Sequence, residues 1–410
     1  MPGPLAGPLD GVRILDLTSV GFGPYAGQLL GDYGAEVIKV EAPEGDITRG
    51  IAPYRNPGMG HFFMNANRNK RSVVLDLKLA SARDACLKLV EQSDVLISSI
   101  RPAALARLGL GYEDCQRVNP NLVYVALVGF GQDGPYARRP AYDDIIQGLC
   151  GMADMQGGRS GEPRFVNASI CDKICSQFAV HATLAALFHR ERTGQGQLVE
   201  VPMLESMVGF NLIEHASGQT FQPTLGDAGY ERSMVPFRRP YATADGFVCV
   251  LPYTTKQWRA FFEVVGQPTL CEDSRVNDAK LRSEKIGELY ELVAQYVASW
   301  KTDALLEALE AADIPNGRAN ELQQLPHDPH LQAVGLFETF EHDSEGTVRM
   351  TRPGVKFSQS PAGIRTLPRR LGEDSRAVLG EAGFSDADIA KLIDEGATFD
   401  GARALGDAAD

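Results

Sequence analysis

The chain has 410 residues, of which 44% are apolar and 23% charged, values typical of a globular protein with two or three domains. Acidic side chains outnumber basic ones by 53 to 40, and the net charge of −13 disfavours nucleic acid and anionic membranes as partners. It still permits an anionic small ligand, which needs only a local basic pocket.

Nothing in the sequence indicates secretion, membrane insertion or a metal site. We find no run of about 18 apolar residues, and residues 1–5 lack the charged and apolar regions of a signal peptide. The seven cysteines include no C-x-x-C pair. We therefore expect a cytoplasmic enzyme with reduced thiols and no bound metal.

Strand-like and helix-like segments alternate through the first third of the chain. Short apolar, β-prone runs are separated by a glycine-rich turn or by helical periodicity. Strands are expected at 12–17, 36–41, 72–77, 94–97 and 122–128, a turn at 21–24, and helices at 25–31 and 80–92. This alternation predicts an α/β fold whose large domain is a doubly wound, Rossmann-like parallel sheet.

The second half of the chain predicts a smaller α/β domain. We expect the large domain at 1–220, a linker at 221–240, the small domain at 241–325 and a return to the large domain at 326–410. The remaining elements are expected as helices at 143–150, 173–192, 203 onward, 255–265, 284–312 and 385–395, and as β-like pieces at 197–201, 246–251 and 347–358.

A glycine-rich turn, Gly21-x-Gly23-x-x-Ala26, separates the first strand from the first helix, and Glu41 ends the next strand. In dinucleotide-binding folds such glycines approach a pyrophosphate, and the carboxylate binds a ribose. A tight turn in any βαβ unit has the same pattern. Both interpretations stay open at this point.

Basic residues lie around several predicted strands. A run at 67–71 precedes one strand, Lys78 follows it, and Arg101 and Arg107 follow the next. Because ligands bind at the carboxyl edge of parallel sheets, these cations can converge on one anionic ligand. The alternative is a solvated, basic surface.

Asp172 is the strongest candidate for chemistry. It directly precedes the long helix at 173–192, where the helix dipole favours a carboxylate. The alternative is an ordinary helix cap, although Cys175 excludes a reciprocal capping box. The motifs G-x-S-x-G, H-E-x-x-H and G-x-x-x-x-G-K-[ST] are absent, which favours a mechanism led by a carboxylate.

Five motifs, in order and at characteristic spacing, resemble the class III CoA-transferases. This family includes formyl-CoA transferase, the carnitine and bile-acid CoA-transferases and the α-methylacyl-CoA racemases. The resemblance covers nearly the whole chain. The motifs lie at Pro8–Leu17, Gly31–Glu41, Asn67–Ser72, Gly129–Pro135 and Arg190–Gln197.

The resemblance implies that Asp172, about 18 residues before the Arg-x-Arg-Thr-Gly motif, is the catalytic nucleophile. It would carry CoA from an acyl-CoA donor to a carboxylic acid acceptor through a mixed anhydride and an aspartyl-CoA thioester. CoA is then a substrate, no permanently bound cofactor is needed, and the glycine turn serves CoA rather than NAD. The residues implied in CoA binding are Gly21, Phe22, Leu75, Lys78, Arg101, Arg107, Tyr142 and Asp143. The family also implies an interlocked homodimer.

A racemase and a non-catalytic CoA-binding protein are the two alternative functions. Racemisation needs bases on both faces of the α-carbon, but Tyr142 stands where the family places a histidine, and an unperturbed tyrosine is a poor base at neutral pH. A non-catalytic CoA-binding protein would not need Asp172. The donor and acceptor are left open, with Arg164, Arg238 and Arg239 as candidates for a second carboxylate of the acceptor.

Overall fold

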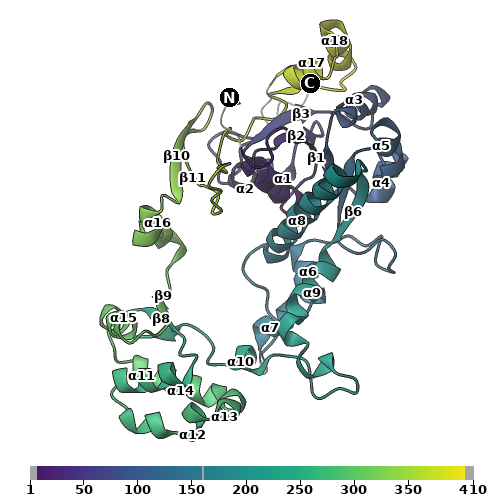
Figure 1. The fold of residues 1–410 in the computed structure, drawn as a ribbon. Coiled ribbons are helices and arrows are strands. Elements are labelled where there is room, and N and C mark those ends of the chain that lie inside the picture. Colours follow the sequence, from purple (N-terminus) through teal and green to yellow (C-terminus); the bar gives the residue numbers. More distant parts are fainter. Residues whose placement is uncertain (1–6, 159–160, 402–410) are drawn as a thin grey trace. The chain divides into compact units, whose positions relative to one another are not determined.

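The computed structural model describes residues 7–158 and 161–401 and divides into two compact units (Figure 1). The residues behind the signal-peptide argument lie outside these ranges. The first unit contains the described chain up to Leu149, Asn167–Val208 and the chain from His330. The second contains the described parts of Cys150–Val166 and Gly209–Pro329, so it includes the predicted linker.

The first unit is built on a six-stranded, wholly parallel sheet in the order β3-β2-β1-β4-β5-β6. This is the doubly wound order, which confirms the predicted fold class. The order reverses between β1 and β4, where the two connections leave in opposite directions and open a crevice at the carboxyl edge. The strands are β1 Arg13–Leu17, β2 Glu36–Glu41, β3 Lys70–Val74, β4 Val95–Ser98, β5 Val123–Val128 and β6 Gln197–Pro202.

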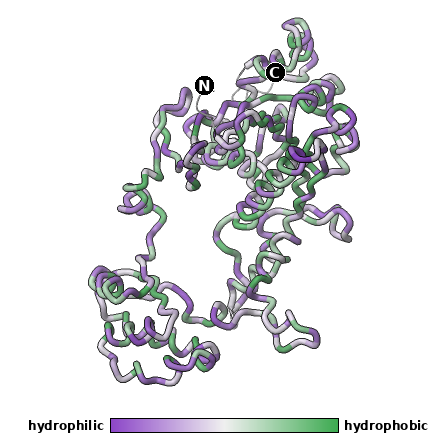
Figure 2. Tube along the Cα trace, in the orientation of Figure 1, coloured by the Kyte–Doolittle hydropathy of each residue, from purple (hydrophilic) through white to green (hydrophobic). Residues whose placement is uncertain are grey.

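Helices cover both faces of this sheet because alternate strand residues point to opposite sides. One face, represented by Leu15, Leu96 and Tyr124, packs into a buried cluster with α3 (Ala80–Glu91) and α5 (Tyr112–Val118). On the other face, α1 (Phe22–Asp32) and α8 (Ile170–Thr193) lie side by side. Figure 2 shows hydrophobic stretches gathering around the strands, as expected for a sheet buried on both faces.

The rest of the first unit surrounds the sheet. It contains a β-hairpin and several short helices, and α9 begins in this unit. These elements are α2 His61–Ala66, α4 Pro102–Arg107, α6 Asp143–Leu149, α9 Met203–His215, α16 Pro329–Ala333, β10 Phe337–His342, β11 Gly346–Thr351, α17 Ser375–Glu381 and α18 Asp386–Asp394.

The second unit has its own core under a small antiparallel sheet in the order β7-β8-β9. Trp258, Phe261, Phe262 and Tyr290 form the aromatic centre of this core. The elements are β7 Tyr241–Ala242, β8 Phe247–Val250, β9 Asn316–Arg318, α7 Met152–Gly157, α10 Glu231–Met234, α11 Thr255–Val264, α12 Ser274–Asn277, α13 Ala279–Glu284, α14 Ile286–Val297 and α15 Thr302–Ala311.

Several predicted elements were wrong in extent, among them the β-like piece expected at 347–358, which is β11 and ends at Thr351. The helix expected at 284–312 is divided between α14 and α15, because Asp245 accepts hydrogen bonds from the backbone N–H and hydroxyl of Thr302 and starts a new helix there. The strand expected at 72–77 is β3, which ends at Val74. The Asp76 carbonyl closes a turn with the N–H of Leu79 directly after it.

Candidate active site

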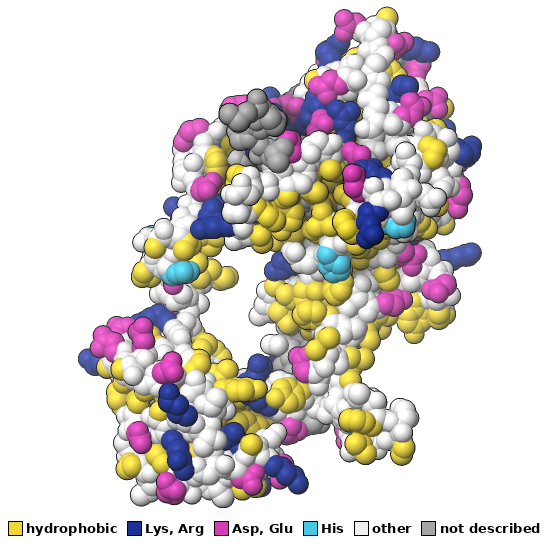
Figure 3. Space-filling model, viewed as in Figure 1, with side chains coloured by type: hydrophobic (Ala, Val, Ile, Leu, Met, Phe, Trp, Pro, Cys, Tyr) yellow, Lys and Arg dark blue, Asp and Glu magenta, His cyan; other side chains and the backbone are white. Residues whose placement is uncertain are grey.

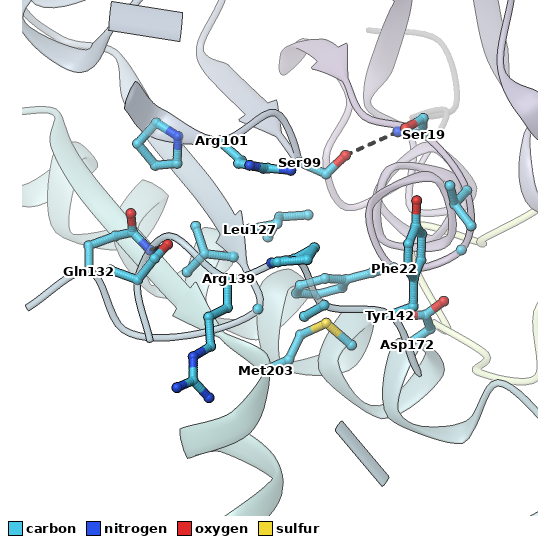
Figure 4. Close-up of a pocket in the computed structure, with 18 residues that line it drawn as sticks. Ser19, Phe22, Ser99, Arg101, Leu127, Gln132, Arg139, Tyr142, Asp172 and Met203 are labelled. Atoms are coloured by element: carbon cyan, nitrogen blue, oxygen red, sulfur yellow. Dashed lines mark hydrogen bonds between the residues drawn. The ribbon is translucent and has the colours of Figure 1, made fainter. Parts of the chain in front are cut away.

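A cavity of about 240 Å³ lies at the reversal point of the six-stranded sheet, entirely within the first unit. Its walls come from the segments that follow β1, β4 and β5, together with the start of α8. The Ser19 N–H donates to Ser99 Oγ at 3.1 Å, which joins the ends of β1 and β4 across the reversal point (Figure 4). This is the position at which doubly wound folds bind their ligands.

Asp172 lies in the first turn of α8 and lines this cavity. The helix begins at Ile170, earlier than expected, and Ser169 is its N-cap. The interpretation of Asp172 as the helix cap is therefore wrong, and its side chain is not consumed by a capping bond. Sequence periodicity missed this start because residues 170 and 171 read equally well as loop.

Gly21 faces the Asp172 carboxyl group. A Cβ atom at position 21 would lie 2.4 Å from Asp172 Oδ2, far inside van der Waals contact. Gly21 has φ −112°, so close approach rather than an unusual backbone angle demands glycine here. The Ser176 hydroxyl lies 2.6 Å from the Phe22 carbonyl oxygen and 2.7 Å from that of Asp172, which holds α1 and α8 together at this point.

Asp143 supports Asp172 from behind. Its Oδ1 accepts a 2.9 Å hydrogen bond from the Asp172 backbone N–H. Its Oδ2 accepts a 2.7 Å hydrogen bond from the side-chain amide of Gln147. Burial, and then the charge of Asp143, raise the pKa of the Asp172 carboxyl from 3.8 to about 7. Such a shift is typical of functional carboxylates in clefts.

The turn before Gly21 is held in an unusual conformation. Val20 has a φ of 71°, which is costly for a β-branched residue. Its N–H points to Asp46 Oδ1 at 3.3 Å, while Lys39 Nζ donates to Asp46 Oδ2 and to the Thr18 carbonyl. Lys39 and Asp46 are both buried. A buried ion pair therefore fixes the strained turn beside the cavity.

The residues expected to bind CoA fall into two groups. Gly21, Phe22, Arg101 and Tyr142 line the cavity. The other four do not. Lys78 and Arg107 are exposed, Leu75 is buried in the sheet core, and Asp143 is buried behind Asp172.

The basic run at 67–71 does not converge on the cavity. Arg68 pairs with Asp32 at 2.7 Å, and Lys70 pairs with Asp16 at 2.8 Å, both in buried surroundings. Arg71 bonds to two glutamates. The expectation that this run gathers around an anionic ligand is therefore wrong, because these cations neutralise acids inside the fold.

Sequence reasoning missed Arg139 and Met203, which also line the cavity. The Arg139 guanidinium stacks 3.9 Å from the ring centre of Tyr136. The loop after β5 contains the motif Gly129–Pro135. Within it, Gly131 donates its N–H to the Glu205 carboxylate, so that amide is already engaged.

The cavity is polarised along its length. Figure 4 shows Asp172, Tyr142, Phe22 and Met203 on one side and Arg101, Gln132 and Arg139 on the other. The carboxyl group therefore lies in largely apolar surroundings, while the guanidinium groups are set apart from it. A substrate with an anionic portion and a reactive apolar portion matches this distribution.

Arg164, Arg238 and Arg239 are exposed side chains of the second unit. Within the described ranges, no cluster of His, Cys, Asp and Glu is arranged to hold a metal ion. No helix of this part of the chain is both long and apolar enough to cross a membrane.

The parallel sheet and the cavity at its carboxyl edge are those of an α/β enzyme. The crevice of this Rossmann-like sheet contains the Asp172 carboxyl group, whose pKa is raised, and two arginines lie at a distance from that group. This arrangement is suited to an anionic, nucleotide-like substrate.

The chain belongs to CoA-transferase family III, whose sequence model matches residues 9–375, and it is accordingly a CoA-transferase. It is 32% identical to the succinate–glutarate CoA-transferase of Agrobacterium fabrum, over 91% of this chain and 95% of that protein. It is 31% identical to the succinyl-CoA:glutarate CoA-transferase of Mus musculus, over 95% and 90% of the two chains. A CAIB/BAIF family protein from Brucella suis superimposes with a TM-score of 0.79 at 29% identity, over 92% of this chain and all of that one. The family resemblance seen in the sequence is thus confirmed.

Proposed function

We propose that this protein moves CoA from an acyl-CoA donor to a free carboxylic acid by covalent catalysis at Asp172. The observation that carries the proposal is the position of the Asp172 carboxyl group, which lies in the crevice of the sheet, opposite Gly21 and in apolar surroundings. A carboxylate there is poorly solvated and therefore more reactive than one in water.

The first half of the proposed reaction loads CoA onto the enzyme. The Asp172 carboxylate attacks the thioester carbonyl of the donor, the C–S bond breaks, and CoA leaves as a thiolate. The thiolate then attacks the Asp172 carbonyl carbon of the mixed anhydride. The donor acid leaves as its carboxylate, and Asp172 carries CoA as a thioester.

The second half repeats these steps in reverse with the acceptor. The acceptor carboxylate attacks the aspartyl thioester, and the released thiolate attacks the acyl carbon of the new anhydride. The products are the acceptor's CoA thioester and the free Asp172 carboxylate. No proton or electron is gained or lost overall, so the enzyme has only to bind both substrates and exclude water.

We propose that CoA enters with its reactive end toward Asp172 and its phosphates toward the cationic end. Arg101, which lines the cavity, would contact a phosphate. Lys78 and Arg107 would act beyond the cavity, on the exposed nucleotide. Leu75 would contribute through its carbonyl, because its side chain is buried and its N–H bonds to Glu41.

We also propose a dicarboxylic acid as acceptor. Both relatives named above carry succinate or glutarate in their names. Arg164, Arg238 and Arg239 remain our candidates for its second carboxylate. Equal use of glutarate by wild type and Arg238→Ala, with Lys256→Ala as an exposed control, would remove Arg238 from the proposal.

We further propose that the protein is a cytoplasmic homodimer. Exposed apolar side chains of α8 and α9, among them Phe188, Phe210 and Ile213, fit burial against a second copy. Figure 3 shows hydrophobic side chains at the surface of the molecule.

The decisive experiment is trapping of the acyl enzyme. Incubation with succinyl-CoA and hydroxylamine should convert Asp172 to its hydroxamate, which peptide mass spectrometry detects. Asp172→Asn should lose both the label and CoA transfer, whereas Lys173→Gln, at the exposed neighbouring position, should retain both. Undiminished transfer by Asp172→Asn would refute the mechanism. Exchange of an α-proton in deuterated water without CoA transfer would instead indicate a racemase.

A further inference from the structure

Asp143 and Gln147 form a buried pair that the proposed reaction leaves without a role. They are one helical turn apart on α6 and therefore lie on the same face of that helix. Asp143 is 8% exposed and Gln147 is fully buried. Neither side chain lines the cavity, so neither is placed to contact a substrate there.

Asp143 is a buried carboxylate without a cationic partner among the described residues. Its two oxygens are held instead by the Asp172 backbone N–H and the Gln147 amide. Burying a carboxylate without a cation is costly, and such a group persists only when its hydrogen bonds are well made. These two hydrogen bonds hold the Asp143 side chain close to the first turn of α8, which carries Asp172.

Gln147 fixes the position of the Asp143 side chain. Its side-chain amide donates to Asp143 Oδ2 at 2.7 Å and to the Ala168 carbonyl at 3.2 Å. Ala168 lies in the segment that leads into α8. One fully buried amide thus links the Asp143 carboxylate, and α6 with it, to the start of the helix that carries Asp172.

We propose that Gln147 is a positioning residue, which holds the Asp143 carboxylate against the first turn of α8 and so keeps the Asp172 carboxylate weakly stabilised and strongly nucleophilic. This inference rests on the proposed role of Asp172 as nucleophile. In it, Asp143 acts through Asp172 rather than by contact with CoA. Two features disfavour the ionised form of the Asp172 carboxyl group. The Asp172 backbone N–H already donates to Asp143, and the carboxylate of Asp143 lies nearby. A more basic carboxylate is in turn the better nucleophile.

The charged surroundings of Asp172 leave Asp143 as its main electrostatic partner. The turn from Val20 to Gly23 brings no ionisable group, and the ionisable residue in the first turn of α1 is Tyr25. On α8 itself the neighbouring Lys173 is exposed. The other ionisable groups that line the cavity are Tyr142, Arg101 and Arg139.

The test measures the protonation of Asp172 directly, by NMR titration of aspartate labelled with carbon-13 at the side-chain carboxyl, with Asp172→Asn used for assignment. Gln147→Met keeps the length of the side chain but leaves Asp143 Oδ2 without its amide. We expect the midpoint of Asp172 to fall by about one pH unit, a tenfold change in proton affinity. The acid limb of kcat should move with it.

The kinetic readout separates positioning from binding. Because Gln147 lies outside the cavity, Gln147→Met should lower the plateau of kcat by about tenfold and leave KM for succinyl-CoA within about twofold. Asp143→Asn preserves the shape of the side chain and should shift the Asp172 midpoint in the same direction. It keeps the proposal testable if Gln147→Met does not fold. Asp144→Asn, at the exposed next position of α6, should change neither quantity.

An unchanged Asp172 midpoint in a folded Gln147→Met or Asp143→Asn protein overturns this inference, whatever the loss of stability. The failure of the proposed function is a different result. In that case Asp172→Asn retains CoA transfer, while the NMR titration still reports whether Gln147 governs the carboxyl group.

Discussion

At the scale of single residues, the ionisation of Asp172 opposes folding. A carboxyl group whose pKa is raised in the folded state binds its proton more tightly there than in the unfolded chain. The cost is absent below the ordinary value of 3.8, grows as the pH rises and is complete above about pH 7. The group thus reduces stability in the pH range in which it would work.

Asp172→Asn should therefore stabilise the protein. We expect the free energy of unfolding at pH 8 to rise by about 2 kcal/mol, less than the full pKa shift implies because solvent screens part of it. At pH 5 the gain should be less than half as large. Urea denaturation at both pH values checks this, with Asp144→Asn as an exposed control. A gain independent of pH would contradict the electrostatic cause.

Gly21 gives a second prediction at this scale. Gly21→Ala places a methyl group where Asp172 Oδ2 now lies, so the carboxyl group must move. We expect kcat to fall roughly 100-fold, as displacements of about 1 Å at reacting groups often cause, with little change in melting temperature. Gly380→Ala on α17, where a Cβ meets nothing within 4 Å, is the matched control and should be fully active.

At the scale of elements, the turn between β1 and α1 depends on the buried Lys39–Asp46 pair. Removing one partner of such a pair leaves an uncompensated charge in the interior. We expect Lys39→Met to lower the free energy of unfolding by about 3–5 kcal/mol. It should also weaken CoA binding, because the Val20 turn loses the bond from Lys39 to the Thr18 carbonyl.

The comparison is with Arg13→Met, which removes the partly exposed ion pair with Glu36. Pairs of this kind contribute about 1 kcal/mol or less. Chemical denaturation measures both variants, and calorimetric titration with CoA measures binding. Similar losses of stability in the two variants would show that the buried pair has no special role.

At the scale of the whole molecule, the exposed apolar residues of α9 predict self-association. Ile213 is 84% exposed, unusual for a large aliphatic side chain. We expect light scattering after size exclusion to give twice the mass of the chain, and Ile213→Glu to shift the population toward monomer. Leu322→Glu, at a position 86% exposed on another segment, should remain dimeric. A monomeric wild-type protein would refute the proposed dimer.

The amino-acid sequence was sufficient to predict the alternation of strands and helices, the doubly wound class of the fold and Asp172 as the candidate nucleophile. These features rest on local patterns: apolar periodicity, a glycine turn, and motifs in fixed order. Periodicity read along one segment also located α3 and β5 closely, whereas α1 begins at Phe22, inside the predicted turn. It failed where a distant residue decides an element, as Asp245 does at the start of α15.

Which cations are available to a ligand, and which carboxylates lie close together, could be read only from the folded chain. In the sequence, the basic residues at 67–71 have no acidic partner close along the chain. In the folded protein, Arg68 pairs with Asp32 and Lys70 pairs with Asp16, and both acids are buried. The meeting of Asp143, Gln147 and the first turn of α8 is equally invisible in a linear pattern. Proximity across sequence separation sets electrostatic energies, and that proximity exists only once the sheet has brought the segments together.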